Sequence, residues 1–205
     1  MKELMGLSVP NGSVQIPGSK WKESGSILIT HWGFSGPGII KLSAWAARDL
    51  FEKNYHFPIL INWTKFKEED LRTLVQDYKT ENPKKKILSH PLFDISSRLW
   101  QHLANKAGIC GDLRYLDLSK KVMNKWIEHL VRDEHQVKGK TTFKEEFVTC
   151  GGVELSNLDL KTFECKDIKG LYIVGELVNI DGLTGGFNFQ NAWTSGFLAG
   201  SSLSK

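Results

Sequence analysis

The stretch Gly170-Leu-Tyr-Ile-Val-Gly-Glu176, followed by Asp181-Gly-Leu-Thr-Gly-Gly-Phe-Asn188, predicts a strand, a glycine-rich turn and a helix. The apolar run is typical of a short strand that a glycine ends. After the turn, Phe189, Trp193 and Phe197 recur at four-residue steps, which indicates a helix. The turn between the two elements lets a ligand approach the backbone closely.

The chemistry of this turn suits a ligand that takes up negative charge. Glu176 would stand at the carboxyl edge of a sheet, where ribose or ribityl hydroxyls could donate hydrogen bonds to it. The Gly185-Gly186 pair would open a helix whose free N–H groups and positive dipole end face the ligand. A reduced flavin is such a ligand, because its N1 and C2 carbonyl region takes up negative charge. The same residues also fit an ordinary strand, turn and helix without a ligand, and the residues alone leave both interpretations open.

Upstream of this turn the pattern changes from strands to helices. The runs Ser26 to His31 and Phe57 to Trp63 are apolar and β-branched, so the first third of the chain is expected to be rich in strands. From Lys67 to about Arg132 apolar residues recur at helical spacing, with Pro83 as a stop signal and Ser119 as a cap. These signals predict a small bundle of three helices.

Composition places the chain among ordinary globular proteins. Of its 205 residues, 40% are hydrophobic and 24% are charged, with a formal net charge of +4. No window carries the roughly 18 uninterrupted apolar residues of a membrane span, and the first residues lack the apolar stretch of a signal peptide. Cys110, Cys150 and Cys165 are widely spaced and form no C-x-x-C, so neither a disulfide framework nor a zinc site is indicated. We expect a soluble, cytoplasmic protein without membrane contact or bound metal.

Two other classes of protein stay open. The run Gly33-Phe-Ser-Gly-Pro37 imitates the G-x-S-x-G elbow of serine hydrolases, with His31 as a nearby base, but Pro37 replaces the last glycine and Ser35 is favoured as a helix cap. A nucleic-acid-binding or protein-interaction module would use Lys65, Lys67 and Lys84-Lys85-Lys86. The net charge is modest and no nucleic-acid reader motif occurs, so nucleic acid is disfavoured as a partner.

Four motifs follow one another along nearly the whole chain: Leu4-Met-Gly-Leu-Ser-Val9, Thr30-His-Trp-Gly-Phe-Ser-Gly-Pro37, Val148-Thr-Cys-Gly-Gly-Val153 and Gly170 through Gly200. In these motifs the chain resembles a family of FAD-dependent oxidoreductases that includes aminoacetone oxidase and the bile-acid-inducible oxidoreductase, also described as NAD(FAD)-utilising dehydrogenases. The resemblance implies a Rossmann-like FAD domain that is interrupted by an insertion with a β-barrel-like part and a helical part. The chain then returns to finish the FAD domain.

By this resemblance the chain is expected to be the carboxyl-terminal half of such a flavoprotein. Residues 1–66, completed by about 137–149, would form the barrel-like part, residues 67–136 the helical part, and residues 150–205 the returning segment. The expected fold class is therefore α+β or α/β. It combines a partial β-barrel-like insert and a small helical bundle with the final strand, loop and helix of a Rossmann-like FAD domain.

The resemblance also implies which residues bind the cofactor. Gly175 and Glu176 match the family's strand-end glycine and acid beside the ribityl chain. The loop near the isoalloxazine ring would be formed by Asp181, Thr184, Gly185, Gly186, Phe187 and Asn188. Asn179 and Phe187 depart from the family, which commonly has an acid and a tyrosine there, and either change could alter the polarity near the ring. His31 lies in one of the family's motifs, but it has no assigned chemical role there. We therefore treat it only as a candidate catalytic residue.

The glycine fingerprint G-x-G-x-x-G, which binds the pyrophosphate, does not occur in the sequence and would lie upstream of Met1. Without its charge-assisted contacts, each worth about 1.5–3 kcal/mol, this chain alone should hold no FAD tightly. We therefore expect that the chain alone is inactive, and that its partner is an amino-terminal FAD-binding half acting on an unidentified small molecule. The edge of the strand Leu171 to Val174 could pair in a homodimer.

Overall fold

The computed structural model describes residues 2–140 and 148–204, and the chain divides into two compact units. The first unit comprises Met1–Ser43 and Lys53–Gly139, and the second comprises Ala44–Glu52 and Lys140–Lys205. The fold class is mixed α+β with an antiparallel half-barrel sheet, as the sequence predicts. The finer division into barrel-like, helical and returning parts stays a prediction.

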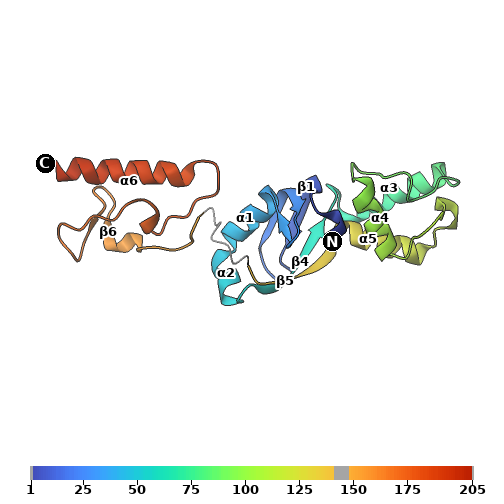
Figure 1. Ribbon diagram of the computed structural model, residues 1–205, viewed down its shortest axis with the longest axis horizontal. Helices are drawn as coiled ribbons and strands as arrows, with labels where there is room; N and C mark the ends of the chain where they lie inside the picture. Colours follow the sequence, from blue (N-terminus) through green and yellow to red (C-terminus); the bar gives the residue numbers. More distant parts are fainter. Residues whose placement is uncertain (1, 141–147, 205) are drawn as a thin grey trace. The chain divides into compact units, whose positions relative to one another are not determined.

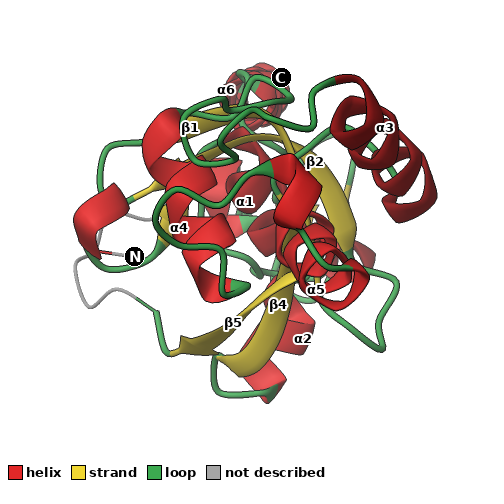
Figure 2. Cartoon of the chain, turned by 90° about the vertical axis from the view of Figure 1, so that its right-hand side faces the viewer, coloured by secondary structure: helices red, strands yellow, loops and turns green. Residues whose placement is uncertain are grey.

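A five-stranded antiparallel sheet forms the centre of the first unit. Its strand order is β3 (Phe34–Ser35), β2 (Lys22–Ile29), β1 (Ser8–Gln15), β4 (His56–Asn62) and β5 (Asp133–Lys138). Figure 2 shows β4 and β5 running side by side, although 70 residues of chain, 63–132, separate them. The last strand of the sheet therefore returns only after the helices have been formed.

The two faces of this sheet differ in polarity because side chains alternate along each strand. Ile27 and Ile29 on β2, and Ile59 and Ile61 on β4, are buried in the core. The intervening positions include polar side chains such as Ser13 on β1 and Asn62 on β4, which are paired with each other, together with apolar ones such as Leu60 on β4. One face of the sheet thus packs inward, and the other carries most of the polar side chains of the central strands.

Three helices cluster beside the sheet in the first unit, as Figure 1 shows: α3 (Glu68–Glu81), α4 (Ser97–Lys106) and α5 (Lys120–Val131). Helix α5 packs against both other helices and against β4 and β5. The predicted cap is confirmed, because Ser119 Oγ accepts a hydrogen bond from the Val122 N–H at 3.3 Å. The buried rings of Trp100 and Trp126 meet edge to face, with centroids 4.6 Å apart, at the centre of the bundle.

The remaining short elements of the first unit are the 3₁₀ turns η1 (Lys2–Leu4) and η2 (Tyr115–Asp117) and helix α1 (Pro37–Trp45). One residue, Gly36, separates α1 from β3, and the boundary between the two units falls within this helix.

The second unit has few regular elements and a small core. Its elements are α2 (Ala47–Glu52), η3 (Leu155–Asn157), β6 (Leu158–Asp159), β7 (Glu164–Cys165), η4 (Gly175–Leu177) and α6 (Phe187–Leu203). One buried cluster in it consists of Leu158, Phe163, Val178 and Ala199. None of the helices in residues 2–140 and 148–204 has the length and hydropathy that crossing a membrane requires.

The strand predicted at Leu171 to Val174 does not form a continuous ladder, which corrects that detail. Its backbone makes one isolated antiparallel bridge, from Tyr172 to Glu164, and the chain then turns into η4. Among the described residues, the strand beside this segment is β7, which is only two residues long. If Leu171 to Val174 formed a longer strand, some of its backbone N–H and C=O groups would have no partner in β7. The edge-paired homodimer stays a prediction. Of the segment 137–149 expected to complete the barrel, residues 141–147 lie outside the described residues.

Candidate functional site

The glycine-rich turn is closed into a ring by the side chain of Asn188. Asn188 Oδ1 accepts a hydrogen bond from the Gly182 N–H at 2.7 Å, and its Nδ2 donates to the Gly182 carbonyl at 2.9 Å. Both polar ends of one amide side chain therefore hold the two ends of the turn together. This bridge closes the turn through bonds within the chain itself.

The backbone at the tip of this turn is open. Gly186 is the N-cap of α6, with φ of +95°, and no side chain caps the helix. A Cβ built on Gly186 would meet nothing within 4 Å, and one built on Gly185 would meet only the Phe187 ring at 3.8 Å. The first N–H groups of α6 have no acceptor within the helix, so they can donate to a ligand. Such N–H groups suit a ligand that presents hydrogen-bond acceptors and develops negative charge, which is the kind of ligand expected here from the sequence.

Gly175 and Glu176 are held beside the same helix. The Gly175 N–H donates to Ser195 Oγ at 3.0 Å, and its carbonyl accepts from Asn191 Nδ2 at 3.3 Å. Glu176 is exposed, and one carboxylate oxygen accepts a hydrogen bond from the Thr149 N–H at 3.2 Å. The structure thus ties Gly175 and the glycine turn to one helix and leaves the Glu176 carboxylate open to solvent.

A second segment runs next to η4 and fixes its position. The Val153 N–H donates to the Leu177 carbonyl at 2.8 Å, and the Asn179 N–H donates to the Val153 carbonyl at 2.9 Å. Gly152 lies so close that an added Cβ would stand 2.7 Å from backbone atoms of residues 177–179. Only glycine allows this approach.

Asn179, which by resemblance stands where an acid is usual, makes two hydrogen bonds that an ionised acid could not both make. Its Oδ1 accepts from Arg48 Nη2 at 3.1 Å, and its Nδ2 donates to Glu154 Oε1 at 2.8 Å. A carboxylate could accept from Arg48 but could not donate to Glu154. The amide therefore links two opposite charges.

Cys150 and Asp181 lie within reach of each other near the same turn. Burial raises the pKa of the Cys150 thiol, and a hydrogen bond with Asp181 raises it further, while Arg48 opposes the rise. The thiol is therefore neutral at ordinary pH. Among the described residues, no group of three or more His, Cys, Asp or Glu side chains is arranged to hold a metal ion.

The residues of the hydrolase alternative are not joined. His31 is exposed in the turn after β2, and its ring packs edge-on against Trp32 with centroids 3.7 Å apart. Ser35 lies in β3, where it pairs with Leu28, and Gly36 separates it from the start of α1. No hydrogen bond between Ser35 and His31 is found in the part of the chain that the structure describes.

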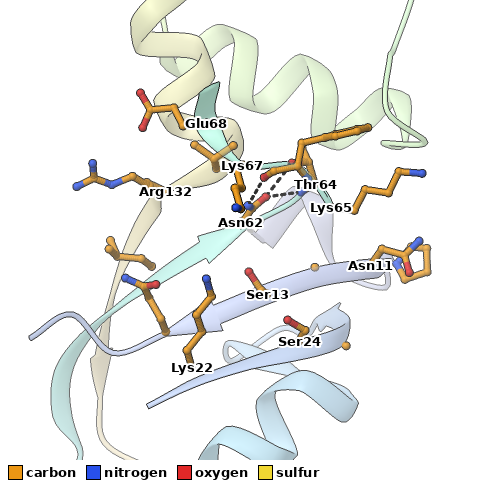
Figure 3. Close-up of a pocket in the computed structure, with 17 residues that line it drawn as sticks. Asn11, Ser13, Lys22, Ser24, Asn62, Thr64, Lys65, Lys67, Glu68 and Arg132 are labelled. Atoms are coloured by element: carbon orange, nitrogen blue, oxygen red, sulfur yellow. Dashed lines mark hydrogen bonds between the residues drawn. The ribbon is translucent and has the colours of Figure 1, made fainter. Parts of the chain in front are cut away.

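A second concave site lies on the polar face of the sheet in the first unit, and sequence reasoning missed most of it. Its volume is about 710 Å³. We call it the basic pocket because its lining includes four cations, Lys22, Lys65, Lys67 and Arg132, beside the acid Glu68 (Figure 3). Of these four cations, only Lys65 and Lys67 were singled out from the sequence. Lys22 lies in β2, and Arg132 is the C-cap residue of α5. The alternation of polar residues along β1 and β2 was the available signal.

These features define a class of protein: an antiparallel half-barrel with a helical cluster, followed by a unit whose open glycine turn begins a long helix. Residues 1–148 match the family model described as "HI0933-like protein barrel and H2TH domain". The chain belongs to this HI0933-like family.

Two curated relatives match almost the entire chain, and a third matches part of it. It is 26% identical over 203 residues to "Ribosomal RNA dihydrouridine synthase" of Escherichia coli K12, which covers 99% of this chain and 48% of that protein. The Haemophilus influenzae protein of the same name is 27% identical over 203 residues, covering 98% and 47% respectively. A 58-residue match, 41% identical, joins the chain to "3-dehydro-bile acid delta(4,6)-reductase" of Clostridium scindens, covering 28% of this chain and 14% of that protein. The chain spans about half the length of the two ribosomal RNA synthases.

Proposed function

We propose that this chain carries the flavin-ring side, and the substrate-covering insert, of an FAD-dependent reductase. The observation that carries the proposal is the open backbone at Gly185-Gly186, where α6 begins without a side-chain cap. The N–H groups there would bind the part of the flavin that takes up negative charge. Glu176 would accept a hydrogen bond from a ribityl hydroxyl. The family membership and the motif resemblance support this assignment.

The names of the relatives support reduction of a carbon–carbon double bond. A dihydrouridine synthase adds two hydrogens to a uracil ring, and a delta(4,6)-reductase removes unsaturation from a conjugated ring system. A bound reduced flavin supplies the hydride for such a reaction. We propose that this chain orients the ring with the fixed glycine turn, while the Asn188 side chain keeps that turn from rearranging.

The outer face of α6 supports an amino-terminal FAD-binding half as the partner. Phe189, Trp193 and Phe197 are each about 70% exposed along one side of the helix. Large exposed apolar faces of this kind are typical of interaction sites. The relatives that the chain matches are about twice as long, so a further polypeptide segment of the same family is the proposed cover.

The test is complementation with the amino-terminal half of the E. coli relative, produced as a separate chain. Mixing the two chains should yield the yellow absorbance of bound flavin, which neither chain retains alone. Glu176→Ala should lower the flavin retained after gel filtration by several-fold, because one hydrogen bond to the ribityl chain is lost. Asp167→Asn, an exposed change of equal charge in the same unit, is the matched control.

Two further variants separate docking from flavin contact. Trp193→Ser should abolish association of the two chains, as measured by gel filtration, whereas Glu176→Ala should leave association intact. If Glu176→Ala and Asp167→Asn retain the same amount of flavin, the role assigned to Glu176 is wrong. If the mixed chains associate but take up no flavin, the proposed function itself fails.

A further inference from the structure

The basic pocket includes none of the residues proposed above to contact the flavin. We propose that it binds the sugar–phosphate backbone of a single-stranded RNA segment, which would carry the nucleotide to be reduced. The proposal deepens the proposed function by naming its substrate class, and it rests on that function for the reaction. The binding step itself needs no flavin, so it can be measured on this chain alone.

The charges of the pocket favour a polyanion. Lys22, Lys65, Lys67 and Arg132 line it, and none of them forms an ion pair with a carboxylate in the described residues. The lining acid Glu68 is paired outside this group of cations, with Arg72 Nη2 at 2.8 Å. The positive charge in the pocket is therefore not neutralised from within. A concave surface with an excess of one sign of charge, here four cations and one acid, attracts and concentrates ligands of the opposite sign.

A hydrogen-bonded turn fixes two of these lysines at the rim. Asn62 Oδ1 accepts from the Thr64 N–H at 2.8 Å and from Thr64 Oγ1 at 2.9 Å, while Asn62 Nδ2 donates to the Phe66 carbonyl at 2.9 Å. The Phe66 N–H in turn donates to Thr64 Oγ1 at 3.1 Å. Lys65 and Lys67 each directly follow one of these hydrogen-bonded residues in the sequence. The turn therefore determines the positions of the two lysine Cα atoms at the rim. Figure 3 shows Lys65 and Arg132 at opposite sides of the opening.

The floor of the pocket offers groups that suit a nucleotide. Ser13 on β1 pairs with Ser24 on β2 and with Asn62 on β4, so three polar side chains form a row across the sheet. With about 4.8 Å between strands, this row is about 10 Å wide. In the described ranges the hydroxyls of Ser13 and Ser24 have no hydrogen-bond partner, and both can donate to or accept from a ribose 2′-hydroxyl.

The wall of the pocket adds an aromatic surface. Phe66 lines the pocket with an intermediate exposure, and Lys65 Nζ lies 5.5 Å from the centre of its ring. Single-stranded nucleic acids are commonly held by a positive groove combined with aromatic rings on which bases stack. Acidic residues in the first turn of α3 offset the positive end of its helix dipole. The attraction for an anion therefore comes from the cationic side chains of the pocket and not from the helix end.

Two observations favour RNA over other anions. The volume of about 710 Å³ exceeds what one phosphate group needs and lies in the range of sites for larger ligands. The two relatives that match 203 residues are named for ribosomal RNA, which is a polyanion with a 2′-hydroxyl on every sugar. Free phosphate would use the cations alone and would leave the serine row unused.

The test is fluorescence anisotropy of the full chain with labelled oligouridylate of about twelve nucleotides, within the usual range for single-strand sites. Matched oligodeoxyuridylate differs only in lacking the 2′-hydroxyls. The triple variant Lys65→Gln, Lys67→Gln and Arg132→Gln should bind RNA on the order of a hundredfold more weakly at about 0.1 M salt. Loss of three phosphate contacts at about 0.7 each should lower the salt slope by about 2.

The matched control removes three exposed cations of the first unit that lie outside the pocket, by Lys41→Gln, Lys120→Gln and Lys121→Gln. The RNA affinity of this control should stay within about threefold of that of the unmodified chain, and its salt slope should stay close to that of the unmodified chain. Ser13→Ala combined with Ser24→Ala should leave binding of the deoxy-oligonucleotide unchanged and lower the preference for RNA. Circular dichroism verifies that each variant is folded.

Three outcomes would overturn the proposal: equal losses in the pocket and control variants, equal binding of the two oligonucleotides, or no binding of RNA. In each of these cases the flavin complementation described above can still succeed, so the two proposals fail separately. Conversely, RNA binding that depends on the pocket would stand even if the mixed chains took up no flavin.

Discussion

At the scale of single residues, Asp133 organises the interior of the first unit. Its side chain is fully buried and accepts a hydrogen bond from Trp63 Nε1 at 3.0 Å. His135 Nε2 lies 2.7 Å from the same oxygen, and Lys106 forms an ion pair with the other oxygen. Burial by itself would raise the pKa of Asp133, but the hydrogen bonds and charges of His135 and Lys106 lower it to about 2. One carboxylate therefore joins α4, β5 and the residue after β4.

Removing this carboxylate should destabilise the first unit. Asp133→Ala leaves the Trp63 N–H and the Lys106 ammonium without their acceptor, and breaking a buried pair typically costs 3–5 kcal/mol. We expect a loss of about 3 kcal/mol in the free energy of unfolding, because Lys106 retains some contact with water. Urea unfolding followed by tryptophan fluorescence measures it. The neighbouring exposed Glu134→Ala should change stability by less than about 0.5 kcal/mol, and equal losses would show that Asp133 has no special role.

A second residue-scale prediction concerns pH. Burial lowers the pKa of His129, the charge of Lys106 lowers it further, and Asp133 acts in the opposite direction. Its Nε2 is buried without a hydrogen-bond partner among the described residues. Because the folded pKa is below the unfolded value of 6.5, the unfolded chain binds the proton more readily. The stability contributed by neutral His129 is present above about pH 6.5 and is lost as the pH falls through the folded pKa.

Urea midpoints measured between about pH 8 and pH 5 test this sign. The unmodified chain should lose stability more steeply on acidification than His129→Gln does. The exposed His56→Gln serves as the control and should keep the slope of the unmodified chain. A loss of stability on acidification in His129→Gln that equals or exceeds the loss in the unmodified chain would contradict the prediction.

At the scale of elements, the contact of Gly152 with η4 positions the segment that holds Glu176. Gly152→Ala would place a Cβ 2.7 Å from backbone atoms of residues 177–179, and backbone cannot move aside as a flexible side chain can. We expect a loss of about 1–3 kcal/mol in the stability of the second unit, the usual cost of overpacking. Hydrogen exchange of the Val153 and Asn179 amides should become faster.

Gly196→Ala provides the opposite case within the same unit. Gly196 lies inside α6, and an added Cβ meets nothing within 4 Å. Alanine is favoured over glycine in helices by about 0.5–1 kcal/mol, so this variant should gain stability. If both substitutions changed stability by the same amount, close packing at Gly152 would not be the cause.

Comparison of elements also shows what the sequence could predict. The start of α5 at Ser119 and the stop of α3 before Pro83 depend on neighbouring residues, so local signals were sufficient. The Asp133 cluster was not predicted, because its partners at positions 63, 106 and 135 meet only when the sheet and the bundle fold together. The pairing of Asn188 with Gly182 likewise depends on the shape of the turn, although both residues lie in the stretch that resemblance had singled out.

At the scale of the whole molecule, the chain has two units with very different cores. Among the described residues, the first unit buries three tryptophans and most of the large apolar residues, whereas the second buries only a few apolar residues, four of which form one cluster. Proteins with separate cores often do not unfold in one step. We therefore expect two transitions in urea, with the second unit unfolding first.

Variants assign the two transitions. Gly152→Ala should move only the transition at lower urea, and Asp133→Ala only the one at higher urea, because each residue contacts its own unit. Far-ultraviolet circular dichroism and tryptophan fluorescence should give different midpoints, since Trp63, Trp100 and Trp126 are in the first unit and Trp193 is exposed in the second. A single transition that both variants shift equally would contradict this division.

The exposed side of α6 has a thermodynamic consequence for any association that covers it. Phe189, Trp193 and Phe197 together offer a large area of ordered hydration water. Removing apolar surface from water gives a negative heat-capacity change, so the enthalpy of association should become more favourable as the temperature rises. Calorimetry at a series of temperatures would then report, through the slope of that enthalpy, how much of this aromatic side is enclosed.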